Sequence, residues 1–307
     1  MRVLVVGAGA IGGYFGGRLL QAGHDITFLV RPGRAGELAS RGLVIRSPNG
    51  DMLLKRPPTV VANALNETFD VVLLSCKAYD LTDAINSFAP AVGPRTSIIP
   101  LLNGMKHLDA LDQRFGRECV LGGLCTILVT LNEQRDIVQL LPMQSFVFGD
   151  RNRMLDRHMR AIADLIESGN FNGTLSETIS QDMWEKWVFI ASLAASTSLM
   201  RASIADIVVA PGGRDFMVDL IDECKSVASA CGHPPRAPFV EQKLALLTDT
   251  GSHLTASMFR DMEAGLRVEA DHVIGDLVGR ANAASVPVPL LRAAYTRLKA
   301  YESASFQ

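Results

Sequence analysis

Arg2-Val-Leu-Val-Val-Gly7-Ala-Gly-Ala-Ile-Gly12 opens the chain and decides the fold of its N-terminal half. Residues 2–6 form a short β-branched run, which is typical of a buried strand. A G-x-G-x-x-G turn follows at once, and the helical pattern that begins inside it ends near residue 22. Residues 25–30 again resemble a strand. Strand, glycine turn, helix and strand within about thirty residues predict a βαβ unit.

In this context the glycine turn predicts a dinucleotide site. Gly7 permits the tight turn, Gly9 lets the backbone approach a pyrophosphate, and Gly12 allows the helix to pack close to the strand. The anion would bind the unpaired N–H groups at the start of the helix, where Ala10 and Ile11 lie. A glycine-rich turn that binds nothing is the structural alternative.

The residue after the second strand distinguishes the two dinucleotides. NAD-binding units carry an Asp or Glu at this place, which accepts a hydrogen bond from the ribose 2′-OH. This chain has Arg31 there, with Arg34 shortly after it. A guanidinium binds a 2′-phosphate through charge-assisted hydrogen bonds, whereas a carboxylate repels it. The sequence therefore predicts NADP(H) as the cofactor. Arg34 is explained equally well as a solvated loop charge.

The rest of the chain divides into two regions. Strand-like runs occur at residues 69–75, 96–102, 120–131, 137–141 and 146–148, and the pair Asn49-Gly50 predicts a hairpin. Helical spacing dominates from about residue 176. We expect an α/β Rossmann-type doubly wound domain over residues 1–175 and an all-α domain for substrate binding or dimerisation over residues 176–307.

Composition excludes several classes of function. The net charge of −2 argues against nucleic-acid or anionic-membrane partners, and no apolar run is long enough to cross a bilayer. Five scattered cysteines without a C-x-x-C pair indicate reduced thiols, and the six histidines lack metal-ligand spacing. We therefore expect a cytoplasmic protein, a possible homodimer, with a small-molecule substrate and no metal.

Motifs along nearly the whole chain resemble, in order, those of the ketopantoate reductase family. They are Gly7-Ala-Gly-Ala-Ile-Gly12, Arg31, Ser75-Cys-Lys77-Ala, Leu102-Asn103-Gly104-Met, Trp184-Glu-Lys186, Ser257-Met-Phe-Arg-Asp-Met262 and Glu269. The resemblance implies NADPH-dependent reduction of a 2-keto acid to a 2-hydroxy acid, as in the 2-dehydropantoate 2-reductase step of pantothenate biosynthesis.

The resemblance also implies roles for individual residues. Lys77 and Asn103 would contact the cofactor, and Asn103, Lys186 and Ser257 would contact the substrate. Lys186 would be the general acid, Ser257 would bind the substrate carboxylate, and Glu269 would bind near the substrate oxygen. Chemistry supports the role of Lys186, because a partly desolvated ammonium stabilises a developing alkoxide and donates a proton to it.

Each of these residues also has an ordinary structural explanation. Lys77 follows a strand, where lysines are often solvated, and Asn103-Gly104 is a good turn. Lys186 could extend along an amphipathic helix with its charge in water. Glu269 lies among other charged residues on what reads as a helix, and could belong to a solvated surface.

The chain departs from the family pattern at two positions. The reductases that make pantoate carry asparagines four and eight residues after the catalytic lysine, whereas this chain has Ile190 and Ala194. Residues 186, 190 and 194 share one helix face. We expect a substrate with a more apolar tail than ketopantoate. An imine- or opine-type reductase and a non-catalytic NADPH-binding regulatory protein are the alternative functions.

Overall fold

The computed structural model describes residues 1–306, which divide into two compact units. The N-terminal unit comprises Met1–Leu102 and His107–Ser180. The helical unit comprises the short loop Asn103–Lys106 and the chain from Gln181 onward.

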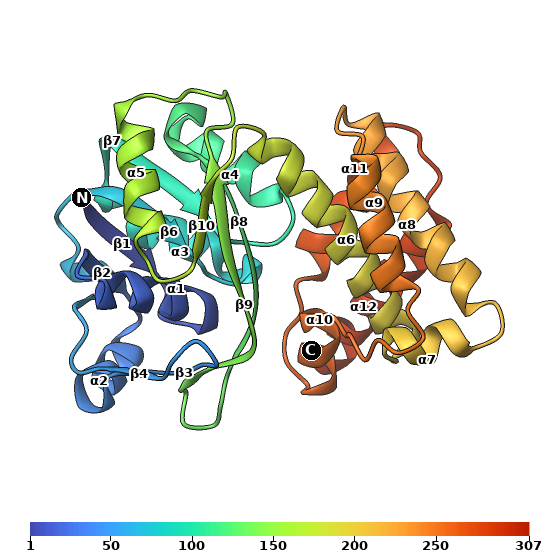
Figure 1. Cartoon of the computed structure of the whole chain (residues 1–307), viewed down its shortest axis with the longest axis horizontal. Helices are drawn as coiled ribbons and strands as arrows, with labels where there is room; N and C mark the ends of the chain where they lie inside the picture. The colour runs from blue at the N-terminus through green and yellow to red at the C-terminus, as the bar shows by residue number, and fades with distance from the viewer. Residues whose placement is uncertain (307) are drawn as a thin grey trace. The chain divides into compact units, whose positions relative to one another are not determined.

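A five-stranded parallel sheet forms the first layer of the N-terminal unit (Figure 1). Its strand order is β5-β2-β1-β6-β7, which is the doubly wound arrangement that the sequence predicts. The strands are β1 (Arg2–Val6), β2 (Asp25–Leu29), β5 (Thr59–Val60), β6 (Phe69–Leu74) and β7 (Val92–Pro100). Because β1 lies at the centre, the loops after β1, β2 and β6 come together at one edge of the sheet.

A second sheet has the order β10-β9-β3-β4, with β8 paired to β9. Its strands are β3 (Leu43–Arg46), β4 (Met52–Leu54), β8 (Gly122–Leu131), β9 (Ile137–Gly149) and β10 (Asn172–Leu175). The predicted hairpin is confirmed, since β3 and β4 are antiparallel and Gly50 has a φ of 102° in the turn between them.

Strand β9 corrects one expectation. The sequence predicts two strands here, at residues 137–141 and 146–148, whereas the structure has one long strand through Pro142. The pairing with β8 shifts register at this point, because Gln139 lies opposite Val129 and Gln144 lies opposite Ile127. A proline is tolerated at such an irregularity, where it removes no ladder hydrogen bond.

Helix α1 (Ala10–Gln21) lies between the two sheets and is rich in glycine for that reason. A Cβ added at Gly16 would lie 2.8 Å from Phe28 and 2.9 Å from Val5, both in the first sheet. Added Cβ atoms at Gly13 and Gly17 would meet side chains of the second sheet, among them Ile137, Leu43, Ile45 and Met52. Small residues on opposite faces of one helix therefore let both sheets approach it.

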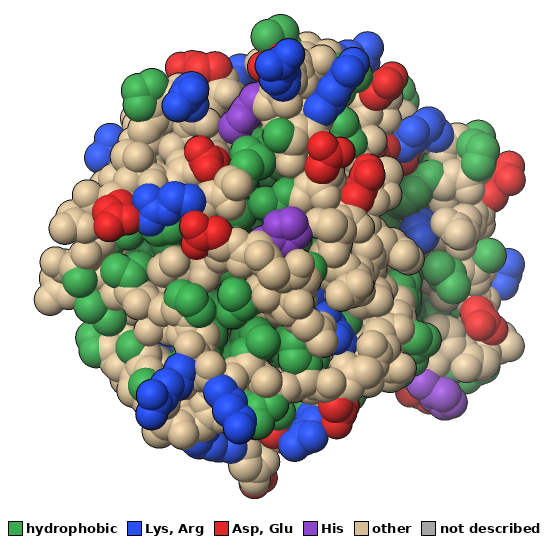
Figure 2. All heavy atoms as spheres, turned by 60° about the vertical axis from the view of Figure 1, so that its left-hand side comes forward, with side chains coloured by type: hydrophobic (Ala, Val, Ile, Leu, Met, Phe, Trp, Pro, Cys, Tyr) green, Lys and Arg blue, Asp and Glu red, His purple; other side chains and the backbone are tan. Residues whose placement is uncertain are grey.

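Three further helices of the N-terminal unit are α2 (Pro32–Arg41), α3 (Leu81–Phe88) and α5 (Arg157–Glu167). Helix α4 (Lys106–Phe115) begins at the last residue of the loop that belongs to the helical unit. On the face that Figure 2 shows, acidic and basic side chains are interspersed and no large patch of one sign forms.

The helical unit has no strand among its described residues, so the expected all-α character is confirmed. Its helices are α6 (Ile179–Met200), α7 (Ile204–Val209), α8 (Gly213–Ala230), α9 (Ala237–Leu247), α10 (Ser257–Glu263), α11 (Asp276–Ala283) and α12 (Pro289–Ser305), with a π-helical turn at Asp271–Gly275. Along residues 1–306, no helix combines the length and apolarity needed to cross a membrane.

Helix α6 is the buried core of the helical unit. Residues 191–198 are all buried, whichever way they face. Three hydroxyls among them donate back to the helix itself: Ser192 to the carbonyl of Val188 at 2.8 Å, and Ser196 and Thr197 to that of Leu193 at 3.2 Å and 2.7 Å. The buried Ser198 hydroxyl has no hydrogen-bond partner among residues 1–306. Small side chains, most of them satisfied within the helix, allow this stretch of α6 to be closely packed.

Candidate functional site

The glycine turn has the backbone geometry that an anion site requires. Gly7 has a φ of +94°, which a residue with a side chain rarely adopts, and its N–H donates to the carbonyl of Leu29 at 2.9 Å. The Ser75 hydroxyl holds the turn from the other side, donating to Val6 O at 2.9 Å and to Gly7 O at 3.3 Å. The turn is thus fixed between β2 and β6.

Gly9 and Gly12 are small for different reasons. A Cβ at Gly12 would lie 2.0 Å from the Ser75 hydroxyl and 2.3 Å from the carbonyl oxygen of Gly7. A Cβ at Gly9 would meet no atom within 4 Å. Gly12 is therefore required by the fold, whereas the space beside Gly9 is open to a ligand.

The start of α1 offers unpaired donors beside this space. Gly9 is the N-cap and makes no side-chain cap bond, and the bond from Gly13 N to Gly9 O at 2.9 Å begins the helical ladder. The N–H groups of Ala10, Ile11 and Gly12 precede that bond and have no partner within the helix. No acidic residue lies in the first turn, so the positive end of the helix is not compensated.

Two cations lie at the same edge of the sheet. Arg31 follows β2 as the N-cap of α2, and its side chain is 76% exposed. Lys77 follows β6, is exposed, and accepts at its carbonyl from the N–H of Asp80 at 2.9 Å. The Arg31 guanidinium lies 3.0 Å from a carboxylate oxygen of Asp80. Arg31 and Asp80 therefore lie together at the sheet edge where the 2′ position of a bound dinucleotide is expected, and Lys77 is close to Asp80 in sequence.

Arg34 holds two segments of the N-terminal unit together. Its side chain is only 11% exposed, so it is not a solvated loop charge. The guanidinium donates to the Ala8 carbonyl at 3.3 Å and to Glu37 at 2.8 Å. These bonds fasten α2 to the glycine turn, and they leave Arg31 as the more accessible arginine.

Asn103 lies in the loop that belongs to the helical unit. Gly104 follows it with a φ of +78°, and a Cβ there would lie 2.8 Å from the carbonyl oxygen of His272. The N–H of His272 in turn donates to the Glu269 carbonyl at 3.2 Å. The backbone of Gly104, next to Asn103, thus lies close to His272, whose N–H is bonded to the Glu269 carbonyl.

Lys186 is held by its neighbours on α6. Trp187 donates its indole N–H to the Val273 carbonyl at 2.8 Å, and the Val273 N–H donates to the Glu269 carbonyl at 3.0 Å. Trp184 packs against Trp187 with the ring centroids 5.0 Å apart. This chain of contacts ties the backbone of Lys186 to that of Glu269 within the helical unit.

The preceding residue, Glu185, anchors the same turn of α6. It is buried and accepts from the backbone and the side chain of Arg236, each at 2.8 Å. Burial raises the pKa of Glu185, but the hydrogen bonds from Arg236 outweigh it and hold the pKa below its ordinary value. The ionised pair fixes the loop before α9 (Ala237–Leu247) to α6 beside Lys186.

Ser257 and Glu269 lie beside different parts of α6. Ser257 is exposed at the first residue of α10, and the preceding Ala256 N–H donates to the Thr197 hydroxyl at 3.4 Å. Thr197 follows Lys186 by about 16 Å of helix rise.

Glu269 is not inside a helix, as the sequence suggested, but directly precedes a helix that begins at residue 270. Its carbonyl accepts from the first turn of that helix.

His272 gives the Asn103 loop a pH dependence. Burial lowers the pKa of His272 to about 4, and the charge of Lys106 adds to the effect. The unfolded chain takes up a proton below about pH 6.5, whereas the folded chain resists it down to about pH 4. The folded state should therefore lose on the order of 3 kcal/mol between these limits.

Urea unfolding of the wild type and His272→Gln at pH 7 and pH 5 tests this expectation. The difference in unfolding free energy between the two pH values should be larger in the wild type than in the variant. Equal differences in the two proteins would show that His272 does not carry the acid sensitivity. The comparison uses the pH difference within each protein, so a uniform loss of stability in the variant does not affect it.

Two residues near the predicted site were missed by the sequence reasoning. Ser75 was quoted in a motif but given no role, although a serine at the end of a strand beside a glycine turn could have suggested one. Nothing in the sequence around Asp80 pointed to a role in the site, because its pairing with Arg31 joins loops that are far apart in sequence. Among residues 1–306, no group of three His, Cys, Asp or Glu side chains could hold a metal ion.

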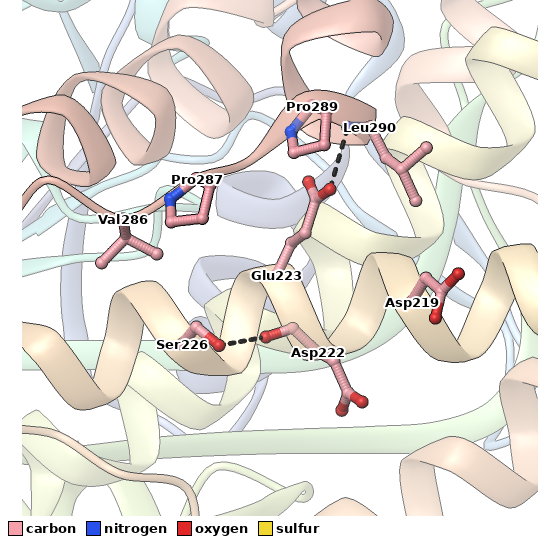
Figure 3. Close-up of a pocket in the computed structure, with 8 residues that line it drawn as sticks. All are labelled: Asp219, Asp222, Glu223, Ser226, Val286, Pro287, Pro289 and Leu290. Atoms are coloured by element: carbon pink, nitrogen blue, oxygen red, sulfur yellow. Dashed lines mark hydrogen bonds between the residues drawn. The ribbon is translucent and has the colours of Figure 1, made fainter.

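A shallow concavity of about 460 Å³ also occurs in the helical unit (Figure 3). Glu223 occupies its wall and accepts from the N–H groups of Leu290 and Leu291, both at 2.9 Å, so its carboxylate caps α12. None of the predicted site residues lines this concavity. We assign it no part in the candidate site.

Comparisons with known proteins identify the family of the chain. The model of the family described as Ketopantoate reductase PanE/ApbA matches residues 3–153, and that of its C-terminal part matches residues 178–302. An uncharacterized oxidoreductase, YkpB, from Bacillus subtilis (strain 168) is 36% identical over 303 residues, which cover 99% of each chain.

Two solved structures share the fold. A PanE/ApbA family ketopantoate reductase from Ralstonia eutropha JMP134 superposes with a TM-score of 0.90 at 21% identity, covering 100% of both chains. D-mandelate dehydrogenase with NADH and anilino(oxo)acetate superposes with a TM-score of 0.87 at 18% identity, covering 99% of both chains.

Proposed function

The chain belongs to the ketopantoate reductase PanE/ApbA family, and from this premise we propose that it is an oxidoreductase that uses NADPH to reduce a 2-keto acid to a 2-hydroxy acid. The observation that carries the proposal is the open space beside Gly9 at the uncompensated start of α1, with Arg31 at the same sheet edge. Such a site suits a pyrophosphate and a 2′-phosphate.

The residues present fit this cofactor. The N–H groups of Ala10, Ile11 and Gly12 would bind the pyrophosphate, and Arg31 and Lys77 would bind the phosphate of the ribose. When bound, NADPH supplies the hydride. The D-mandelate dehydrogenase structure that shares this fold contains NADH, so the fold alone does not specify NADPH. Arg31 is our reason for preferring NADPH here.

The helical unit would supply the proton and the substrate contacts. In the proposed reaction Lys186 stabilises the negative charge that develops on the keto oxygen and then donates a proton to it. The carboxylate of Glu269 would keep the ammonium charged and oriented. The Ser257 hydroxyl would bind the substrate carboxylate, and the Asn103 amide would contact both cofactor and substrate.

The face of α6 that carries Lys186 indicates the class of substrate. Ile190 is half-buried and Ala194 is 4% exposed, so two aliphatic side chains follow the lysine at successive turns. Neither can pair a hydroxyl group, and an unpaired buried hydroxyl costs roughly 1–3 kcal/mol. We propose a 2-keto acid whose tail is more apolar than that of ketopantoate.

A panel of keto acids assayed with NADPH and with NADH tests the proposal. For the wild type, kcat/KM for branched apolar 2-keto acids should exceed that for ketopantoate by about tenfold or more. The double variant Ile190→Asn/Ala194→Asn should narrow or reverse this ratio, whereas Ile190→Val should preserve it.

Efficient turnover of ketopantoate by the wild type, without turnover of apolar keto acids, would refute the substrate class. NADPH oxidation that requires an added amine would identify an imine reductase instead. Tight cofactor binding without turnover of any substrate would favour a non-catalytic protein.

A further inference from the structure

The Asp80 carboxylate is directed to Arg31 and not to the helix that follows it. Asp80 ends the 3-10 turn Ala78–Asp80, which leads directly into α3, and its side chain makes no cap bond to that helix. One carboxylate oxygen lies 3.0 Å from the Arg31 guanidinium, and the Asp80 side chain is 34% exposed. The carboxylate therefore binds the cation that the proposed function assigns to the 2′-phosphate.

This pairing has opposite consequences for the two dinucleotides. A phosphate monoester carries nearly two negative charges at neutral pH. It must displace Asp80 from Arg31 or bind beside a like charge, and either event weakens binding. NADH has a neutral 2′-hydroxyl, which can donate to a carboxylate. Asp80 thus opposes NADPH at the same place where it can assist NADH.

We propose that Asp80 is a cofactor-selectivity residue, which reduces the preference for NADPH over NADH by competing for Arg31. The inference rests on the proposed function only in placing the 2′ position of the ribose beside Arg31. Lys77 lies three residues before Asp80, and Arg34, three residues after Arg31, pairs with Glu37. Removal of Asp80 would leave the Arg31 guanidinium to bind the phosphate without competition from the Asp80 carboxylate.

Dissociation constants for NADPH and NADH, measured by titration calorimetry on the full chain, test the inference. Asp80→Asn should bind NADPH about tenfold more tightly, and NADH within about twofold of the wild type or more weakly. The gain for NADPH should diminish with added salt. Asp83→Asn is the matched control, because it removes an exposed carboxylate from the same helix and should change neither constant.

A double-mutant cycle tests whether Asp80 acts through Arg31. In an Arg31→Met background, Asp80→Asn should improve NADPH binding by less than about threefold. Weaker NADPH binding by Asp80→Asn, or equal changes for both cofactors, would overturn the inference. A wild type that binds neither cofactor would overturn it as well. Binding without any turnover would refute the proposed reductase activity and leave the selectivity inference intact.

Discussion

Replacing Lys186 with methionine is expected to lower kcat for keto-acid reduction by about 10²–10⁴-fold and to leave the NADPH dissociation constant nearly unchanged. Methionine keeps much of the apolar stem of the lysine but cannot stabilise an alkoxide or donate a proton. Most residues of the proposed cofactor site belong to the N-terminal unit and Lys186 is not among them, so cofactor binding and turnover should separate. Titration calorimetry with NADPH and single-turnover oxidation of bound NADPH measure the two quantities.

Two further variants define the role of Lys186. Lys186→Arg keeps the positive charge but has a pKa too high for efficient proton donation, so it should preserve substrate binding better than kcat. Lys225→Met removes a partly exposed lysine of the same unit that pairs with Asp222 at 2.7 Å, and should retain wild-type kcat. Turnover by Lys186→Met at the wild-type rate would refute the assigned role and favour another proton donor.

Gly12→Ala is expected to lose stability, whereas Gly9→Ala is expected to lose cofactor affinity. The methyl group at residue 12 would overlap the Gly7 carbonyl, a backbone atom that the turn holds in place. We expect Gly12→Ala to lose about 3 kcal/mol of unfolding free energy or to misfold. Gly9→Ala has room for its methyl group and should unfold like the wild type. The same methyl group would obstruct a pyrophosphate, so NADPH affinity should fall at least about tenfold.

Thermal unfolding and NADPH titration of both variants check this contrast. Gly36→Ala serves as the control, because a Cβ there also meets no atom within 4 Å and the residue lies within α2, outside the G-x-G-x-x-G motif. It should keep both stability and cofactor affinity. A Gly9→Ala protein that binds NADPH normally would remove the main support for the proposed cofactor site.

Much of the first sheet could be predicted because its signals are local. The β-branched run at residues 2–6 and the glycines that follow it specify a strand, a turn and a helix from short-range sterics alone. Apolar runs identified β6 and β7 in the same way. The second sheet was harder to predict, because β9 pairs with β3, β8 and β10, which come from three separate parts of the chain. The continuity of β9 through Pro142 depends on these distant partners.

The candidate site likewise combines features with a local sequence signal and features that depend on distant parts of the chain. The residue types and order at Gly7, Arg31 and Lys186 could be recognised from the sequence, since each has a chemical reason to occur there. The partners of these residues could not. Arg34 fastens to Ala8, and Asp80 binds Arg31, only because the loops after different strands converge at one sheet edge. Convergence of this kind is a property of the folded sheet.

The position of α1 between two sheets restricts how this protein can be redesigned. An engineer who wishes to change coenzyme choice has no freedom inside the helix, because larger side chains at residues 13, 16 or 17 would push a whole layer outward. Arg31 is exposed and Asp80 is partly exposed, so their side chains can be replaced without moving a sheet. Libraries for altered nicotinamide usage should therefore randomise the rim and leave the helix as it is.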